Sequence, residues 1–423
     1  MTLGGRRDTA WWKSAVVYQI YPRSFVDSNG DGFGDLGGII GRLDYLRALG
    51  VDVIWLSPIY RSPQADNGYD ISDYRDIDPL FGALAEFDAL LAKVHELRMK
   101  LVMDLVVNHT SDEHPWFVES RSSRDNPTRD WYIWRDARYG AEPNNWGSFF
   151  VGSAWEGEQA TDQYYLHLFD RKQPDLNWEN PQVRKAVHDI MHWWLDRGVG
   201  GFRMDVINFI SKTDGLPDAP AIPGQRFVIA FDGFADGPHV HDYLAEMTRE
   251  VFGRREGQFI TIGEMPAVTP EQARLYTDPA RGELNMVFQF EHMSIDRSPT
   301  NKFDYLGLDR LVLKKALFRW QGVGGNWLEQ PVLEQPRPAS RRVPVRRRRT
   351  GLLGRLGEGA RDRSARHAWH VVRLSRRGTR NDELPVPDSA GPQGRRGREL
   401  LQGRARMRRR RDCGARRSSQ DQS

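Results

Sequence analysis

The sequence predicts a TIM-type (β/α)8 barrel, truncated after about six βα units, with a small domain inserted after the third strand and a disordered C-terminal tail. Three observations predict it. Strand-like and helix-like segments alternate over roughly the first 320 residues, charged motifs close several of the strands, and the composition changes abruptly beyond Trp327. The predicted parts are residues 1–109 and 179–325 for the incomplete barrel, 110–178 for the inserted domain, and 326–423 for an Arg-rich tail without a domain.

Short apolar runs bounded by turn residues predict six strands, at residues 15–21, 51–56, 100–107, 199–205, 259–264 and 285–291. Between them, apolar residues of 181–199 recur at helical spacing, with Asn180 as a cap and Pro181 at the first position. A last helix is expected over 308–320. Residues 110–178 are too many for an ordinary connection, which indicates the inserted domain.

Charge is unevenly divided along the chain. Residues 328–423 contain 26 Arg, no Lys and 10 acidic residues, whereas residues 1–327 contain 35 basic and 47 acidic ones. The single cysteine excludes a disulfide scaffold. No run approaches the ~18 apolar residues of a membrane span, and the N-terminus has no apolar signal region. We therefore expect a cytoplasmic protein without a membrane partner.

Two carboxylates stand at the ends of neighbouring predicted strands. Asp205 closes the segment GFRMD, and Glu264 closes the segment IGE. Barrel enzymes place catalytic groups at the C-terminal ends of strands, so both side chains are expected over the barrel mouth. Arg203 lies two residues before Asp205, points to the same side and would keep Asp205 ionised. A retaining glycosidase needs two such carboxyl groups ~5–5.5 Å apart, although spacing alone leaves two unrelated surface acids as an alternative.

Four segments together resemble glycoside hydrolase family 13, and in particular its α-glucosidase and oligo-1,6-glucosidase branch. GFRMDVIN at 201–208 is similar to the family's nucleophile motif, and DLVVNH at 104–109 to its third-strand motif. QPDLN at 173–177 resembles the motif that closes the inserted domain, and DNGYD at 66–70 the substrate-pocket segment. The four motifs stand in the family's order.

This resemblance implies a role for each matching residue. Asp205 would be the nucleophile and Glu264 the acid/base, with Arg203 orienting Asp205. The resemblance also implies that Tyr69 stacks on the terminal glucose, and that Asp70 and His109 bind its hydroxyl groups. The expected substrate is an oligosaccharide of the isomaltose or maltose type, from which single glucose units are released.

Two further positions refine this expectation. Phe150 resembles an aromatic residue lining the glucose pocket, with a residue of the inserted domain's core as the alternative. Val206 follows the nucleophile, and in this branch Val there accompanies a preference for α-1,6 links. Its steric effect is worth ~1–3 kcal/mol in discrimination.

Oxygen-bearing residues alternate in the loop 27–35, where Gly32 permits a sharp turn. This pattern suits a hard cation such as Ca²⁺ or Mg²⁺, and the resemblance implies a similar loop holding a structural ion. The loop is not a complete EF-hand, because Gly38 stands where the bidentate Glu would be. An Asx-rich turn without a cation is the alternative. The candidate ligands are Asp27, Asn29, Asp31, Phe33 and Asp35.

The family pattern breaks at the expected seventh strand, where members carry a third carboxylate in an Asn-His-Asp motif that this sequence lacks. The residues from Leu328 onward can be back-translated into permissible codons. When these codons are read from the second base of the Leu328 codon, they give Trp-Asn-Ser-Leu-Tyr-Trp-Asn-Asn-His-Asp. We therefore hypothesise a frameshift between Trp320 and Trp327, with an out-of-frame tail beyond it. Without strands seven and eight, two sheet edges stay open, and we expect an unstable chain with little or no hydrolysis.

Other functions stay open. A sucrose or trehalose isomerase would share the same site, and a non-catalytic ancillary homologue would share the fold. A nucleic-acid-binding arm is the alternative for the tail, but the tail lacks interleaved aromatic residues, so no nucleic-acid partner is expected. The oligomeric state is not predicted.

Overall fold

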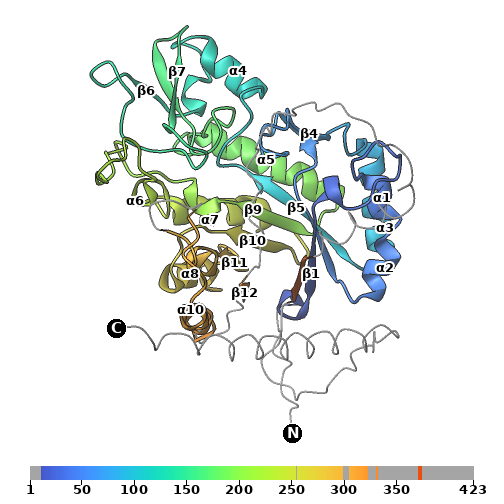
Figure 1. The fold of residues 1–423 in the computed structure, drawn as a ribbon. Coiled ribbons are helices and arrows are strands. Elements are labelled where there is room, and N and C mark those ends of the chain that lie inside the picture. The colour runs from blue at the N-terminus through green and yellow to red at the C-terminus, as the bar shows by residue number, and fades with distance from the viewer. Residues whose placement is uncertain (1–10, 254, 299–303, 323–329, 332–369, 374–423) are drawn as a thin grey trace, which may run out of the picture. The chain divides into compact units, whose positions relative to one another are not determined.

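All six predicted strands form and lie side by side in chain order as one parallel sheet (Figure 1). This computed structural model describes residues 11–253, 255–298, 304–322, 330–331 and 370–373. The predicted order of βα units is confirmed. The strands are β1 (Val16–Ile20), β2 (Val53–Leu56), β5 (Lys100–Val106), β9 (Gly201–Asp205), β10 (Ile260–Glu264) and β11 (Met286–Gln289).

Each edge of this sheet carries one short strand that the sequence analysis did not foresee. β12 (Gln330–Pro331) pairs in parallel with β11, and β13 (His370–Arg373) pairs antiparallel with β1. The two edges expected to be open are therefore paired over two to four residues. The rest of the tail and residues 323–327, part of the segment where a frameshift is hypothesised, lie outside the described residues, and the disorder of the tail stays a prediction.

Helices and short turns connect the strands and cover the outer face of the sheet, where the largest apolar cluster lies. Side chains on the opposite face of the sheet form a second apolar cluster that includes Val53, Trp55 and Phe288. Burial on both faces is typical of parallel strands, and every residue of β9 and β10 is buried. The helices around the sheet are α1 (Leu36–Ile40), α2 (Leu43–Ala48), α3 (Leu84–Glu96), α5 (Pro181–Arg197), α6 (Phe231–Phe234), α7 (Val240–Met247), α8 (Pro270–Thr277), α9 (Glu291–Ser294) and α10 (Arg310–Gly322).

The helix predicted over 181–199 forms as α5, and its ends follow the expected rules. The Asn180 side chain accepts a hydrogen bond from the Gln182 backbone N–H at 2.9 Å, and Pro181 occupies the first turn. Gly198 ends the helix with φ 108°. The chain then enters β9, where Gly201 has φ 144° and a Cβ would lie 2.0 Å from the carbonyl oxygen of Ile260. Glycine at 201 therefore lets β9 and β10 approach closely.

The inserted domain contains α4 (Pro115–Ser122) and a three-stranded antiparallel sheet in the order β6-β8-β7. Its strands are β6 (Trp134–Asp136), β7 (Trp155–Glu158) and β8 (Gln163–Leu166). Before it, β3 (Tyr60–Arg61) and β4 (Asp73–Ile77) form a separate pair. The segment that closes the domain returns beside the end of β5, because His109 and Asp175 form an antiparallel bridge.

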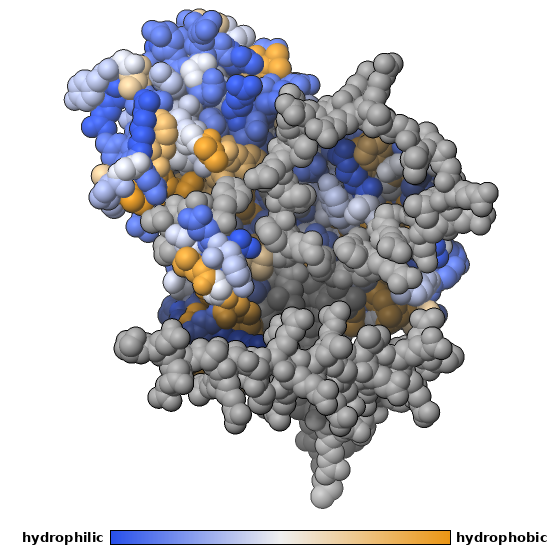
Figure 2. All heavy atoms as spheres, in the orientation of Figure 1, coloured by the Kyte–Doolittle hydropathy of each residue, from blue (hydrophilic) through white to orange (hydrophobic). Residues whose placement is uncertain are grey.

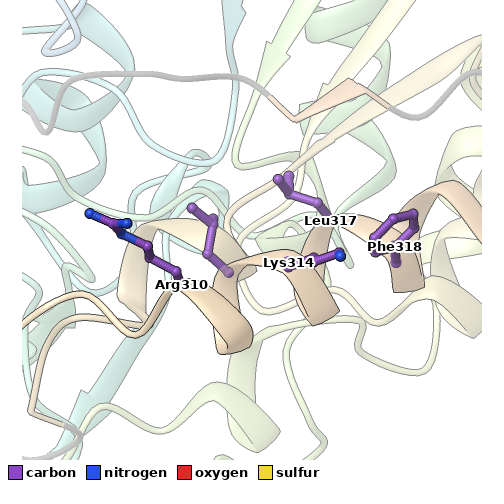
Figure 3. Close-up of a pocket in the computed structure, with 5 residues that line it drawn as sticks. Arg310, Lys314, Leu317 and Phe318 are labelled. Carbon is purple, nitrogen blue, oxygen red and sulfur yellow. The ribbon is translucent and has the colours of Figure 1, made fainter.

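The last long helix, α10, leaves large apolar side chains at the surface. Leu311 is 60% exposed and Phe318 is 59% exposed. Figure 2 shows apolar atoms at the surface in the region where Figure 1 draws α10. A cavity of about 250 Å³ lies along this helix, lined by residues such as Arg310, Leu317 and Phe318 (Figure 3). Within the part of the chain that the structure describes, no helix is long and apolar enough to cross a membrane.

Candidate active site

Three adjacent strands bring charged side chains to one place. β5 carries Asp104, β9 carries Arg203 and Asp205, and β10 ends at Glu264. In the sheet register Asp104 stands opposite Arg203, which stands opposite Ile262 on the other side. Asp104, Arg203 and Asp205 are fully buried, and Glu264 is 6% exposed. The strands therefore gather the predicted catalytic pair and its arginine, together with Asp104.

Arg203 joins the three carboxylates. Its Nη1 donates to Asp104 Oδ1 at 2.6 Å and to Asp205 Oδ1 at 2.8 Å, and its Nη2 donates to Glu264 Oε2. Burial opposes the guanidinium charge, but the carboxylates of Asp104, Glu264 and Asp205 raise the pKa of Arg203 well above its ordinary value. The cation in turn stabilises the ionised forms of its three partners.

Val206 follows Asp205 in a left-handed conformation, with φ 36° and ψ 43°. A β-branched residue adopts this region rarely. Its backbone N–H donates to Glu264 Oε2 at 3.3 Å, so the turn after the first carboxylate also contacts the second. The Val206 side chain is buried in an apolar cluster with Trp146 of the inserted domain and with Phe209 and Phe234.

Aromatic side chains surround Asp104 and Arg203. Trp55 Nε1 and the Tyr69 hydroxyl each donate to Asp104 Oδ2 at 3.3 Å. The Arg203 guanidinium lies 5.0 Å from the Trp55 ring centre and 5.9 Å from that of Tyr69. The predicted pocket residue Tyr69 therefore lies within the carboxylate cluster, and cation–π contact adds to the hold on Arg203.

His109 lies in a buried polar network. Its Nδ1 is 3.2 Å from Asn108 Nδ2, and its Nε2 is 3.0 Å from Gln173 Nε2. Gln173 Nε2 also donates to Asp66 Oδ2 at 3.1 Å. The His109 ring therefore lies where three of the four family-like segments meet, namely 66–70, 104–109 and 173–177.

Asp70 is fully buried, and its oxygens are bound by its own loop. Oδ1 accepts from the Ser62 hydroxyl at 2.9 Å and from the Asp66 backbone N–H at 3.0 Å, and Oδ2 accepts from the Ala65 backbone N–H at 2.8 Å. Burial raises the pKa of Asp70 despite these donors. The structure thus ties this predicted sugar-binding carboxylate to residues 62–66.

Phe150 is 38% exposed and contacts Phe169 edge-to-face at 6.0 Å between ring centres. Phe169 in turn lies 5.2 Å from the His109 ring. Phe150 therefore connects to the site through Phe169, which the sequence analysis did not single out. Its partial exposure differs from that of a buried core residue of the inserted domain.

Lys212 is the charged residue that the sequence analysis missed. It is 6% exposed, and its Nζ lies 2.8 Å from Asn108 Oδ1, from Asp175 Oδ2 and from the Phe209 carbonyl oxygen. Burial lowers the pKa of Lys212. One ammonium group therefore joins the end of β5, the returning segment of the inserted domain and the turn after Asp205.

The predicted cation loop binds its own backbone. Asp27 accepts from Gly30 N–H at 2.6 Å and Gly32 N–H at 2.9 Å, and these bonds lower its pKa. Asp35 instead caps α1 and accepts from Gly38 N–H at 2.6 Å. Across the described ranges, no group of three or more His, Cys, Asp or Glu side chains is placed to hold a metal. These contacts fit the Asx-turn alternative, and the cation stays a prediction. Asn29 and Asp31 accept from the backbone N–H groups of Asp31 and Phe33.

Comparison with known proteins adds a family match over residues 19–335, to the catalytic domain of α-amylase. An oligo-1,6-glucosidase of Parageobacillus thermoglucosidasius is 58% identical over 338 residues, which cover 79% of this chain and 60% of that protein. A trehalose-6-phosphate hydrolase of Bacillus subtilis is 50% identical over 339 residues, covering 79% of this chain and 59% of that protein. The chain thus spans about 60% of the length of these curated relatives.

Solved structures of related proteins superpose on most of this chain. The trehalose-6-phosphate hydrolase of Bacillus licheniformis superposes with a TM-score of 0.71 at 50% identity, over 74% of this chain and 55% of that one. A trehalulose synthase superposes with a TM-score of 0.71 at 45% identity, over 75% of this chain and 57% of that one.

Proposed function

Because this chain belongs to the α-amylase family of glycoside hydrolases, family 13, we propose that it encodes a retaining α-glucosidase acting on oligosaccharides. One observation carries the proposal. Asp205 and Glu264 bind the two ends of a single guanidinium, that of Arg203. Two carboxyl groups held this way are close neighbours, as retention requires, whereas inversion needs room for a water between them.

The proposed reaction has two steps. Asp205 attacks the anomeric carbon of the terminal glucose as the bond to the leaving oxygen breaks, and Glu264 gives that oxygen its proton. Glu264, now ionised, takes a proton from water, whose oxygen attacks the same carbon and releases Asp205. Contact with Arg203 favours the ionised forms of both carboxylates, which suits Asp205 throughout and Glu264 in the second step.

We assign substrate contacts to the residues beside this pair. Tyr69 would stack on the terminal glucose, His109 and Asp70 would bind its hydroxyl groups, and Phe150 would line the entrance. The His109 network and the partial exposure of Phe150 support these roles. The ties from Asp70 to Ser62 and the backbone of 65–66 mean that it would rearrange to reach sugar.

We propose a preference for α-1,6 links, supported by Val206 and by several relatives named oligo-1,6-glucosidase. Val206 contacts Glu264 through its backbone N–H, which brings this residue beside the proposed acid/base and supports a steric role for it. The ratio of kcat/KM for isomaltose to that for maltose, measured on the chain restored to the hidden reading frame beyond Trp327, tests this preference. A ratio below one would contradict it.

A second candidate is an isomerase that returns the glucosyl group to the released sugar before water does. The trehalulose synthase at 45% identity favours considering it. Chromatography of the products that the frame-restored chain forms from sucrose distinguishes the two. Glucose and fructose support the hydrolase, and a new disaccharide supports the isomerase. A non-catalytic homologue would give neither product.

The assignment of Asp205 as the nucleophile can be tested with a cyclitol epoxide that has the configuration of α-glucose, called the α-glucose epoxide below. A carboxylate opens the epoxide when an acid protonates its oxygen, and one event per molecule leaves a stable ester visible by mass spectrometry. In the frame-restored chain we expect the adduct on the peptide that contains Asp205, and none in Asp205→Asn. An adduct on another carboxylate would contradict the assignment.

We further propose that the chain as printed carries a frameshifted tail and therefore turns over little or no substrate. The hidden Asn-His-Asp reading frame beyond Trp327 and the Lys-free, Arg-rich composition support this. Resequencing the gene and assaying both reading frames with p-nitrophenyl α-glucoside test it. Robust turnover by the 423-residue chain, or an intact gene with this tail expressed, would refute it.

We also propose a structural Ca²⁺ or Mg²⁺ in the loop 27–35, away from the carboxylate cluster. The exposed oxygens of Asp27, Asn29 and Asp31 suit a hard cation chemically. Asp35 is committed to α1, so binding would require it to turn. A rise in Tm on adding Ca²⁺ or Mg²⁺, lost in Asp27→Ala, would support the site. No change at millimolar cation would reject it.

A further inference from the structure

The turns that follow β9 and β10 each contain a residue other than glycine with a positive φ. Val206, directly after Asp205, has φ 36°, and Ala267, three residues after Glu264, has φ 64°. Neither residue is glycine, and side chains with a Cβ disfavour the left-handed region. Such conformations persist where surrounding contacts hold them, and they cluster at functional sites.

Asn208 connects these two turns directly. It stands three residues after Asp205 and is fully buried. Its side-chain Nδ2 donates to the carbonyl oxygen of Pro266 at 3.0 Å, two residues after Glu264. This hydrogen bond and the one from Val206 N–H to Glu264 are two links between the loops that carry the proposed nucleophile and acid/base.

A second layer holds Asn208 in place. The Asp236 backbone N–H donates to the Asn208 carbonyl oxygen at 2.8 Å. The Asp236 carboxylate accepts from the Tyr276 hydroxyl at 2.5 Å and from Gln272 Nε2 at 3.2 Å, and both donors stand on α8. Asp236 therefore links Asn208 to α8, a helix that begins shortly after Glu264.

We propose that Asn208 is a positioning residue that sets the spacing of Asp205 and Glu264 through its hydrogen bond to Pro266. The inference rests on the proposed function of those two carboxylates. The atom of Asn208 that makes this hydrogen bond is the donor Nδ2. Asn208→Asp keeps the shape and loses that donor, and Asn208→Leu keeps the volume and loses both polar atoms, so both variants are expected to loosen the turn after β10.

The first test needs no catalysis and uses the full 423-residue chain. Hydrogen exchange of the peptide covering residues 264–268 is compared between wild type, Asn208→Leu and Asn208→Asp. We expect exchange to quicken by about tenfold in both variants. The control is Asn144→Leu in the inserted domain. It removes the bond from a buried amide to the Leu216 carbonyl oxygen and the bonds that Asn144 Oδ1 accepts from Trp146 N–H and Trp155 Nε1. Unchanged exchange at 264–268 in the Asn208 variants, or an equal rise in the control, would overturn the proposal.

The second test separates positioning from general loosening. The chain is first restored to the hidden reading frame beyond Trp327. Its inactivation by the α-glucose epoxide is then followed by mass spectrometry, which gives a limiting rate and a binding constant. We expect the limiting rate to fall by about 10- to 100-fold in both Asn208 variants, while the binding constant and the Asn144→Leu control stay near wild type. A wild-type limiting rate in Asn208→Leu would overturn the proposal. If the frame-restored wild type itself acquires no adduct on Asp205, the proposed function fails, and the exchange experiment still decides the role of Asn208.

Discussion

Arg203→Met removes the cation that joins three buried carboxylates. Two of its contacts measure 2.6 and 2.8 Å, and at an effective dielectric constant near 20 each is worth about 6 kcal/mol of Coulomb energy before desolvation. Desolvation offsets much of that sum. Breaking a buried ion pair by removing one partner typically costs about 3–5 kcal/mol, and we expect this loss in the free energy of unfolding at pH 7.

The loss is expected to depend on pH. Without Arg203, the remaining carboxylates relieve their mutual repulsion by taking up protons in the folded state. The folded variant then binds more protons than its unfolded chain, so its stability relative to wild type rises as pH falls. We expect the difference to be smaller at pH 4 than at pH 7.

Urea unfolding followed by tryptophan fluorescence at pH 7 and pH 4 measures both effects. Arg61→Met is the control, because Arg61 pairs with Asp76 at the surface, where the side chains are 50% and 36% exposed. That pair is expected to contribute less than about 1 kcal/mol at either pH. A loss below about 1 kcal/mol in Arg203→Met, or a loss that does not change with pH, would refute this reasoning.

Three other variants probe separate parts of the structure. Gly201→Ala places a Cβ 2.0 Å from Ile260 O, and thermal unfolding should show a loss of at least about 2 kcal/mol, against about 1 kcal/mol for Gly215→Ala, where φ is also positive but the space is open. Val206→Ala should lower the isomaltose-to-maltose ratio of kcat/KM about tenfold in the frame-restored enzyme, and an unchanged ratio would contradict the steric role. Burial lowers the pKa of Lys212, so the ammonium group keeps its proton to a higher pH in the unfolded chain than in the folded one. The free energy of unfolding of wild type therefore rises with pH between the lowered pKa and 10.5. Urea unfolding at a series of pH values below 10.5 should show no such gain in Lys212→Met, and the same pH slope as wild type would contradict this.

The sequence was sufficient to predict the strands and the convergence of Arg203 with its carboxylates. Buried parallel strands are continuous apolar runs, and their C-terminal ends meet at one edge, so Asp205 and Glu264 could be placed by topology. The helix α5 was equally predictable, because its caps at Asn180 and Gly198 are local signals.

Features that depend on long-range contact were not predictable. Lys212 closes an apolar segment, but its partners Asn108 and Asp175 come from elements far away in the chain. The loop donors that hold Asp70 required the fold of residues 62–66. The strand β13 pairs with β1 from a region whose composition has no strand periodicity.

Covalent labelling of the frame-restored chain by the α-glucose epoxide tests the central claim most directly, with the 423-residue chain beside it. We predict one adduct per folded molecule on the peptide holding Asp205, formed quickly in the restored chain, and no adduct in Asp205→Asn. A folded, restored chain that acquires no adduct, or acquires it on a carboxylate other than Asp205, would contradict a retaining α-glucosidase with this nucleophile.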